Sequence, residues 1–229
     1  MDYVQDNKLQ VALAGAGLFA AAGLGFATWV GAFSKMTVQE ATLEGGYLIY
    51  TEYRGSVRNI HSAYKPVMAD YEEFKKQNPS IESRCVGLYY DDPYNLVNPD
   101  EFRACLGFLL ANKNEEMEVF FKNKGYKTAE VPTVPTINGN WPYKCSISFM
   151  LAPMKFYPAG EKYILANKEK YREAIKNQSE KEVSVEVFEE NQVKYYWPLE
   201  KNTDYFLTTY PQGQLKDVDA YKKALQMED

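Results

Sequence analysis

The sequence predicts an α+β domain in which two strand-helix-strand-strand units form one curved antiparallel sheet with its helices on one side. A single N-terminal transmembrane helix precedes the domain. Three observations lead to this prediction. The order strand, helix, strand, strand occurs twice, from about Gly46 to Leu110 and from about Tyr143 to Leu199. Val183 to Leu199 alternates as a β-hairpin does, and Leu9 to Ser34 contains no charged residue.

The uncharged run lies between Lys8 and Lys35. As a helix it would span roughly 39 Å, which exceeds the hydrocarbon core of a bilayer, about 30 Å. Trp29 sits near one end, as interfacial tryptophans do. A cleaved signal peptide is the alternative, but the run is too long for the apolar core of a signal peptide. A signal peptide also begins with a positively charged segment, whereas Asp2 and Asp6 add negative charge here. We therefore expect an uncleaved anchor.

These features divide the chain into four predicted segments: an anchor over residues 1–35, a stalk over 36–45, the domain over 46–211, and a short C-terminal helix or tail over 212–229. The side of the membrane is not readable from charge, because positive residues are sparse at both ends of the run. One glycosylation sequon, at Asn177, would be used only in a lumenal domain.

Composition limits the function classes. The chain has 229 residues, a net charge of −5 and a pI of about 5.2, which argues against a nucleic-acid footprint. The cysteines Cys85, Cys105 and Cys145 form no CxxC pair, and His61 is the single histidine. We expect no metal site, no cofactor and no disulfide, and reduced thiols in a cytosol-facing domain. His61 falls off the apolar face of its predicted helix, so we expect it to be solvated.

The first unit has four predicted elements. A strand covers Gly46–Tyr53, an amphipathic helix carries apolar residues from Ile60 to Phe74, and a strand covers Arg84–Asp91. Pro66 must kink this helix or reset its start. The apolar run Phe102–Leu110 fits a strand or a helix by pattern alone.

The segment between the two units and the second unit itself also contain predicted elements. Asn114 caps a short helix that Gly125 ends. The remaining predicted elements are a loop over Pro132–Pro142, a strand over Tyr143–Leu151, a break over Pro153–Pro158, a charged helix to about Lys176, the hairpin, and a short helix over Leu215–Met227.

The hairpin has two different faces. Val183, Val185 and Val187 lie on one face, and Ser184, Glu186 and Phe188 on the other. A carboxylate that shares a face with aromatic residues is either solvated at a sheet surface or set into a cleft. Two paired units would leave a groove between their helices, and such junctions are common ligand sites.

Three segments resemble the GyrI-like effector-binding family. They are YRGS at residues 53–56 leading into a helix with Ala63-Tyr64, GLYYDDP at 87–93 followed by NPDEFR at 98–103, and VEVF at 185–188 running to YWPL at 196–199. The chain looks most like the membrane-anchored eukaryotic branch, the ER-phagy receptor branch. That likeness rests on the order of the anchor, VGLYYDDP, KNKGYKTAEVP, NWPYKCSI and VEVFEENQVKYYWPL, and covers roughly Ala41 to Tyr210.

The resemblance implies a ligand site. Bacterial relatives bind small, often cationic or aromatic, effectors in the groove, with an acid at the position of Glu186 in its centre. By their nearness to the matching motifs, Tyr89, Trp141 and Tyr196 are the candidate lining residues. A carboxylate beside ring faces in a partly dry slot suits a cation. The alternative is that Glu186 is solvated and the tyrosines only pack.

The branch further implies an endoplasmic reticulum membrane protein with its domain in the cytosol and with partners in the autophagy machinery. Its members carry a long disordered tail with an acidic-aromatic docking motif, and the sequence ending at Asp229 contains no such tail. Two aromatic-x-x-aliphatic patterns do occur, at Tyr94–Val97 and Tyr196–Leu199. We regard both as weak matches, because a four-residue pattern is frequent by chance.

Three functions fit these observations. The first is a membrane-anchored, non-catalytic binding or adaptor protein. The second is a small-molecule hydrolase of the GyrI-like type with Glu186 as acid or base. The third is a tetrapyrrole binder, for which His61 is the single candidate imidazole. Because no Ser/His/Asp, Cys/His or metal constellation is visible in the sequence, we favour the first.

Overall fold

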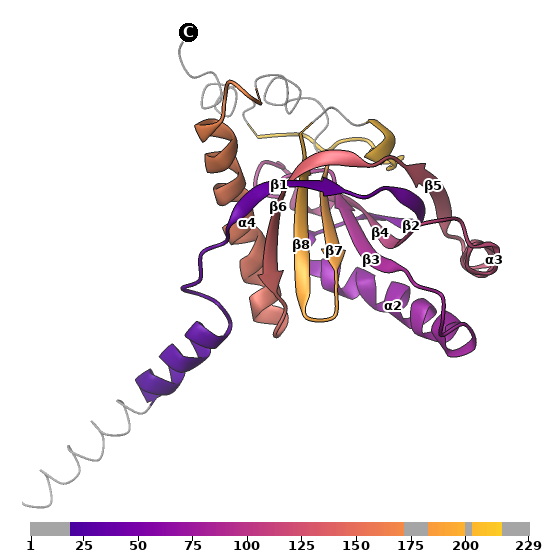
Figure 1. Ribbon diagram of the computed structural model, residues 1–229, viewed down its shortest axis with the longest axis horizontal. Helices are drawn as coiled ribbons and strands as arrows, with labels where there is room; N and C mark the ends of the chain where they lie inside the picture. Colours follow the sequence, from indigo (N-terminus) through magenta and orange to yellow (C-terminus); the bar gives the residue numbers. More distant parts are fainter. Residues whose placement is uncertain (1–18, 172–182, 200–202, 217–229) are drawn as a thin grey trace, which may run out of the picture.

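The computed structural model describes residues 19–171, 183–199 and 203–216. Its strands are β1 Val38–Leu43, β2 Gly46–Arg54, β3 Arg84–Tyr89, β4 Arg103–Leu110, β5 Lys127–Val131, β6 Val134–Pro142, β7 Ser184–Phe188 and β8 Gln192–Pro198. They form one antiparallel sheet in the order β1-β6-β8-β7-β3-β4-β2-β5 (Figure 1). The helices with defined bounds are α2 Ile60–Gln77, α3 Glu115–Asn123 and α4 Ser146–Ala166. Residues 19–29 form a further helix, which projects from the domain.

Two units of the same order build the sheet. β2-α2-β3-β4 is the first, and β6-α4-β7-β8 is the second. Their strands occupy corresponding places, because β3-β4-β2 on one half mirrors β7-β8-β6 on the other. β3 and β7 meet at the centre, while β5 and β1 extend the two outer edges. This arrangement confirms the predicted α+β fold of two units that share one curved antiparallel sheet.

The sheet has a helical face and an opposite face. Under α2 and α3 lies a cluster that includes Tyr64, Phe108 and Phe121, and under α4 lies a second cluster that includes Phe156 and Tyr195. The opposite face is mainly aliphatic and is packed against Tyr205, Phe206 and Leu207. The alternation of the hairpin is confirmed, since Val183, Val185 and Val187 all lie on this opposite face.

The predicted loop over Pro132–Pro142 is wrong, because most of it is strand β6. Its loop-like residues have specific places in the sheet. An added Cβ on Gly139 would lie 2.7 Å from both Met36 and Phe156, so glycine permits close packing there. The buried Asn138 amide donates to the main-chain oxygen of Tyr195 at 3.1 Å. Strand β5 was not predicted, and residues 38–43, assigned to the stalk, form the edge strand β1.

The predicted strand over Tyr143–Leu151 and the break over Pro153–Pro158 are also wrong, because α4 runs through both. The helix begins at a capping box in which the Ser148 hydroxyl accepts from the main-chain N–H groups of Lys144 and Cys145. Pro153 and Pro158 are accommodated inside it. α4 ends at Ala166, whereas the prediction extended it to Lys176, which lies outside the described residues.

Other ambiguities are decided by burial. In the run Phe102–Leu110, residues 103–110 form strand β4, whose eight residues are all buried because both faces of the central sheet are covered. Pro66 lies inside α2 without ending it. The Asn114 side chain accepts from the N–H of Met117, and Gly125 has a φ of 88°, so both ends of α3 are as predicted. The three cysteines are free thiols. Of the predicted C-terminal helix, residues 217–227 lie outside the described ranges.

The predicted transmembrane helix is described only in its second half. Within the described residues, no helix is both long enough and apolar enough to span a bilayer. Residues 9–18 of the predicted span fall outside these residues.

A buried ion pair ties the last described segment to the sheet. The Arg103 guanidinium bonds to both oxygens of Asp91, at 2.7 and 2.9 Å, and the two side chains are 3% and 0% exposed. Arg103 also donates to the main-chain oxygen of Tyr210 at 3.1 Å and lies over the ring of Phe206. One side chain therefore joins β4, the end of β3 and the segment that covers the opposite face.

Replacement of Arg103 by methionine should leave the Asp91 carboxylate buried without its charge partner. We expect urea denaturation to show a loss of about 3–5 kcal/mol in the free energy of unfolding. The matched control is Arg54→Met, which removes a partly exposed pair with Glu101 and should cost at most about 1 kcal/mol. Equal losses in the two variants would contradict this account.

Candidate ligand site

Glu186 lies in the middle of the helical face, on strand β7. Across the sheet it pairs with Gly87 of β3 and with Tyr195 of β8. Directly paired residues of an antiparallel sheet point to the same side, so these side chains share one row. Glu186 is 5% exposed. The solvated alternative is therefore excluded, and the carboxyl sits between the cluster under α2 and the cluster under α4.

Tyr64 of α2 and Tyr89 of β3 bring their hydroxyls to one side of the carboxyl. The two phenol oxygens are 3.2 Å apart, and Tyr89 hydrogen-bonds to Glu186. A hydroxyl has one proton, so when Tyr89 donates to Glu186, Tyr64 donates to Tyr89. Gly87 makes the room, because an added Cβ would lie 2.2 Å from the Tyr64 oxygen and 2.6 Å from the Tyr89 oxygen.

Tyr195 stands on the other side. It is fully buried, and its hydroxyl has no hydrogen-bond partner among the described residues; the same holds for Oε2 of Glu186. Buried polar atoms are nearly always paired in folded proteins. Two unpaired oxygens in one row point to a missing polar or charged partner. Next along β7, the Ser184 hydroxyl lies 2.7 Å from the hydroxyl of Tyr157, which belongs to α4.

Aromatic rings cover Glu186 at the end of β7 that leads into the hairpin turn. Phe188 follows Glu186 on the same face, with its ring 5.3 Å from the ring of Tyr64 and 5.8 Å from the ring of Phe149 on α4. Phe188 and Phe149 are both only partly buried, so these rings, which bridge α2 and α4, have access to solvent on one side. A molecule that reaches Glu186 by this end must displace them.

Burial governs the protonation of the site. It raises the pKa of Glu186 to about 8, although the Tyr89 hydrogen bond acts in the opposite direction. Burial likewise raises the pKa values of the Tyr64, Tyr89 and Tyr195 phenols, and the nearby Glu186 carboxyl adds to each shift. At neutral pH the site is therefore mainly uncharged. A cation that entered it would favour the ionised form of Glu186.

The four predicted site residues separate in space. Glu186 and Tyr89 lie together. Trp141 faces the cluster under α4, where an added Cβ on Gly31 would lie 2.8 Å from its ring. Tyr196 lies on the opposite face of the sheet, since it pairs with Val185. Neither is placed in the row of Glu186.

Sequence reasoning missed Tyr64 and Tyr195, the residues that enclose the carboxyl. Tyr64 had a signal, since it lies within the Ala63-Tyr64 pair that resembles the family motif. Tyr195 shares the face of Glu186 through the register of the β7–β8 pairing, which alternation alone does not supply. His61, on α2, is exposed, as predicted.

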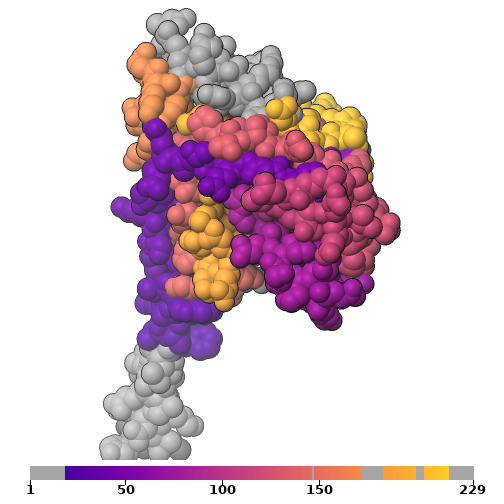
Figure 2. Space-filling model, turned by 45° about the vertical axis from the view of Figure 1, so that its right-hand side comes forward, coloured from indigo at the N-terminus to yellow at the C-terminus, as the bar shows by residue number. Residues whose placement is uncertain are grey.

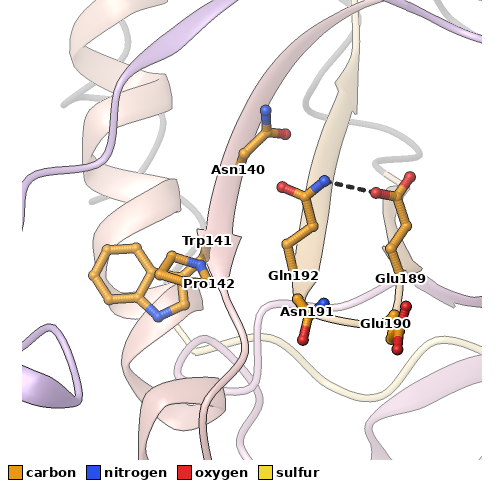
Figure 3. Close-up of a pocket in the computed structure, with 7 residues that line it drawn as sticks. All are labelled: Asn140, Trp141, Pro142, Glu189, Glu190, Asn191 and Gln192. Atoms are coloured by element: carbon orange, nitrogen blue, oxygen red, sulfur yellow. Dashed lines mark hydrogen bonds between the residues drawn. The ribbon is translucent and has the colours of Figure 1, made fainter.

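Two surface cavities lie elsewhere. One, of about 350 Å³, is lined by the end of β6 and by the hairpin turn, and Figure 3 shows the Trp141 indole pointing away from the turn residues. In that turn Gln192 donates to Glu189 at 2.6 Å. The other, of about 500 Å³, lies along the last turns of α4. Neither contains Glu186, which is enclosed by side chains in this conformation. Among the described residues, no group of three or more His, Cys, Asp or Glu side chains is placed to hold a metal ion.

Comparisons with known proteins find only distantly similar structures. No family model and no curated protein matches the chain. Similar solved structures include the EcmrR C-terminal domain, at 10% identity and a TM-score of 0.43 over 71% of this chain and 96% of that one. SAV2435 bound to tetraphenylphosphonium is 9% identical, with a TM-score of 0.44 over 71% and 93% of the two chains. A putative transcription regulation protein of Staphylococcus aureus MU50 is 8% identical, with a TM-score of 0.38 over 72% and 99%. Scores of this size carry no argument about ligand or activity.

The raised pKa of Glu186 predicts a pH dependence of stability. The folded chain holds the Glu186 proton up to about pH 8, whereas the unfolded chain releases it near 4.5. The free energy of unfolding should therefore fall as the pH rises from about 5 to 8. Urea denaturation of Glu186→Gln should show a smaller slope in this window and a gain of a few kcal/mol at pH 8, since one pKa unit is about 1.4 kcal/mol.

The control for this prediction is Glu189→Gln, in the turn of the same hairpin. The pKa of Glu189 is lowered, although burial acts the other way, because Lys194 and Gln192 hydrogen-bond to its carboxyl. Its replacement should leave the slope between pH 5 and 8 as it is in the unaltered protein. An unchanged slope in Glu186→Gln would show that Glu186 is not the titrating group.

Proposed function

We propose that the chain is a membrane-tethered, non-catalytic binding protein of the GyrI-like type whose Glu186 site takes a small organic cation with aromatic or apolar surface. The observation that carries the proposal is the buried Glu186 carboxyl with one unpaired oxygen beside the unpaired Tyr195 hydroxyl. A buried carboxyl gains most from a partner of opposite charge. The surrounding tyrosine and phenylalanine rings offer cation–π contacts to the same ligand.

The two other functions have less support. A hydrolase needs an activated nucleophile or a bound water beside Glu186. Ser184, on the same face of β7, is hydrogen-bonded to the Tyr157 phenol, and no histidine is described near it. Cys85 packs against the cluster under α2, but burial raises the pKa of its thiol to about 12, so it is a poor nucleophile. A tetrapyrrole binder would need an axial ligand in an apolar cavity, and His61 is exposed on α2. The binding function requires neither.

Tetraphenylphosphonium is a suitable probe, because it has one positive charge, on a phosphorus atom bonded to four phenyl rings, and no hydrogen-bond donor. Calorimetry with the full chain in detergent should show that Glu186→Gln weakens binding about tenfold or more. Opposite unit charges about 4 Å apart at an effective dielectric constant of about 20 attract by roughly 4 kcal/mol, and a tenfold change is about 1.4 kcal/mol. The affinity of the unaltered protein should rise between pH 6 and 8, because binding must displace the Glu186 proton.

Glu189→Gln serves as the control here too, since it removes a carboxylate that faces the surface cavity rather than the row. It should leave the affinity unchanged. If Glu186→Gln and the unaltered protein bound the probe equally, at every pH, the site would not be at Glu186.

The location and the partners follow from the family resemblance. We propose that residues 9–34 anchor the chain in the endoplasmic reticulum membrane and that the domain faces the cytosol, where it acts as an adaptor in ER-phagy or protein turnover. Of the two docking patterns, Tyr196–Leu199 extends from a strand paired on both sides. Tyr94 and Val97 are exposed, which favours that segment as the contact for an autophagy partner.

Protease added outside intact microsomes should therefore digest the domain, because a cytosolic domain is open to it. The control is the same digestion after the membranes are dissolved in detergent, where a lumenal marker protein is also lost. Complete protection of the domain, or a glycan on Asn177, would place it in the lumen and remove both the ER-phagy adaptor function and the docking segment.

A further inference from the structure

The outward face of α4 exposes large apolar side chains over its first turns. Ile147, Met150 and Met154 are 47%, 68% and 64% exposed, and they recur at the spacing of one helix face. We call these three residues the apolar stripe. The exposed face of a helix in a soluble domain normally carries polar and charged residues. The first half of α4 therefore lacks the surface expected for contact with water.

The apolar stripe lies beside the place where the helix over residues 19–29 joins the domain. The Lys144 amine donates to the main-chain oxygen of Trp29 at 2.7 Å and lies over its ring. The Lys155 amine donates to the main-chain oxygen of Ala32 at 2.9 Å. In Figures 1 and 2 the helix leaves the domain from the edge where α4 begins.

That helix is itself uncovered. Nearly all residues from 19 to 29 are exposed, including the large side chains of Phe19, Leu24, Phe26 and Trp29. Beyond it, the exposed Phe33 continues the apolar surface toward the domain. Exposed apolar side chains thus lie both on this helix and on the stripe, and the Lys144 and Lys155 contacts join the two regions. A single occupant that covers both is a lipid bilayer.

We propose that the apolar stripe lies in the interfacial layer of a lipid bilayer, so that the first turns of α4 enter this layer and the rest of the helix leaves it. This inference rests on the proposed membrane tether. Ile147 and Met154 are about 10 Å apart along the helix at 1.5 Å per residue, which matches an interfacial depth of about 5–10 Å.

The charges around the stripe fit this orientation. Further along α4 the exposed residues include Pro158, Glu161, Lys162 and Leu165, so charged side chains enter the face beyond Met154, where the helix would leave the interface. Lys35 is exposed near the junction and can reach lipid phosphates. The stripe would therefore have apolar chains below it and water above it.

The test uses the full chain with Cys145→Ser, reconstituted in phosphatidylcholine vesicles, with one environment-sensitive fluorophore on an added cysteine. The labelled variants are Met150→Cys, Phe19→Cys and, as the matched control, Val119→Cys, since Val119 is an exposed apolar residue of α3. Cys85 and Cys105 should stay unlabelled, because burial raises both thiol pKa values to about 12. Quenching by lipids that carry a nitroxide near the headgroup or deep in the acyl chain is then measured.

We expect headgroup-labelled lipids to quench position 150, deep-labelled lipids to quench position 19, and neither to quench position 119. If position 19 is quenched but position 150 behaves like 119, the tether stands and the inference is wrong. If position 19 is not quenched either, the tether fails, and the inference fails with it. If position 150 is shielded from aqueous iodide but not quenched by lipid, a second copy covers the stripe, which also overturns the inference.

Discussion

The burial of one carboxyl at the centre of the sheet constrains much of the helical face. An ionised side chain in an apolar interior is costly, so a buried glutamate must be protonated, paired or hydrogen-bonded. In this protein Tyr89 supplies the hydrogen bond, and burial holds the group near neutrality at pH 7. The row around it reflects this need, because phenols combine an apolar body with a polar tip and can approach the carboxyl without adding charge. The glycine at position 87 is what lets two of them approach at once.

The two-unit architecture supplies the place for such a group. β3 and β7 meet at the centre of the sheet, each with its own helix packed on the same face. A residue on either strand therefore lies between two packed clusters rather than beneath one of them. Its surroundings come from both units: Tyr64 and Tyr89 from the first, and Tyr195 from the second. No single unit could enclose Glu186 by itself, so the site exists only when the sheet is complete.

Sequence patterns predicted some elements well and others badly, for physical reasons. The hairpin was clear because its two faces differ, one aliphatic and one mixed. β6 was misread because Pro135, Asn138 and Gly139 are loop-like in composition, although Gly139 is needed for the close approach of Phe156. Tyr195 was not placed beside Glu186, because its face relative to β7 depends on a sheet register that alternation alone does not supply. Tyr196 was chosen instead, one residue away and therefore on the wrong side.

The failure at α4 has a different cause. An amphipathic helix is recognised by the contrast between an apolar face and a polar face. The inner face of α4 carries Phe149, Phe156 and Tyr157 toward the sheet, whereas its outer face carries the apolar stripe. Because apolar residues lie on both faces of α4 and Pro153 and Pro158 interrupt the pattern, its sequence shows no clear helical period. A helix that is apolar on both faces needs an apolar neighbour on each side. The sheet covers the inner face of α4 and leaves the apolar stripe on its outer face exposed.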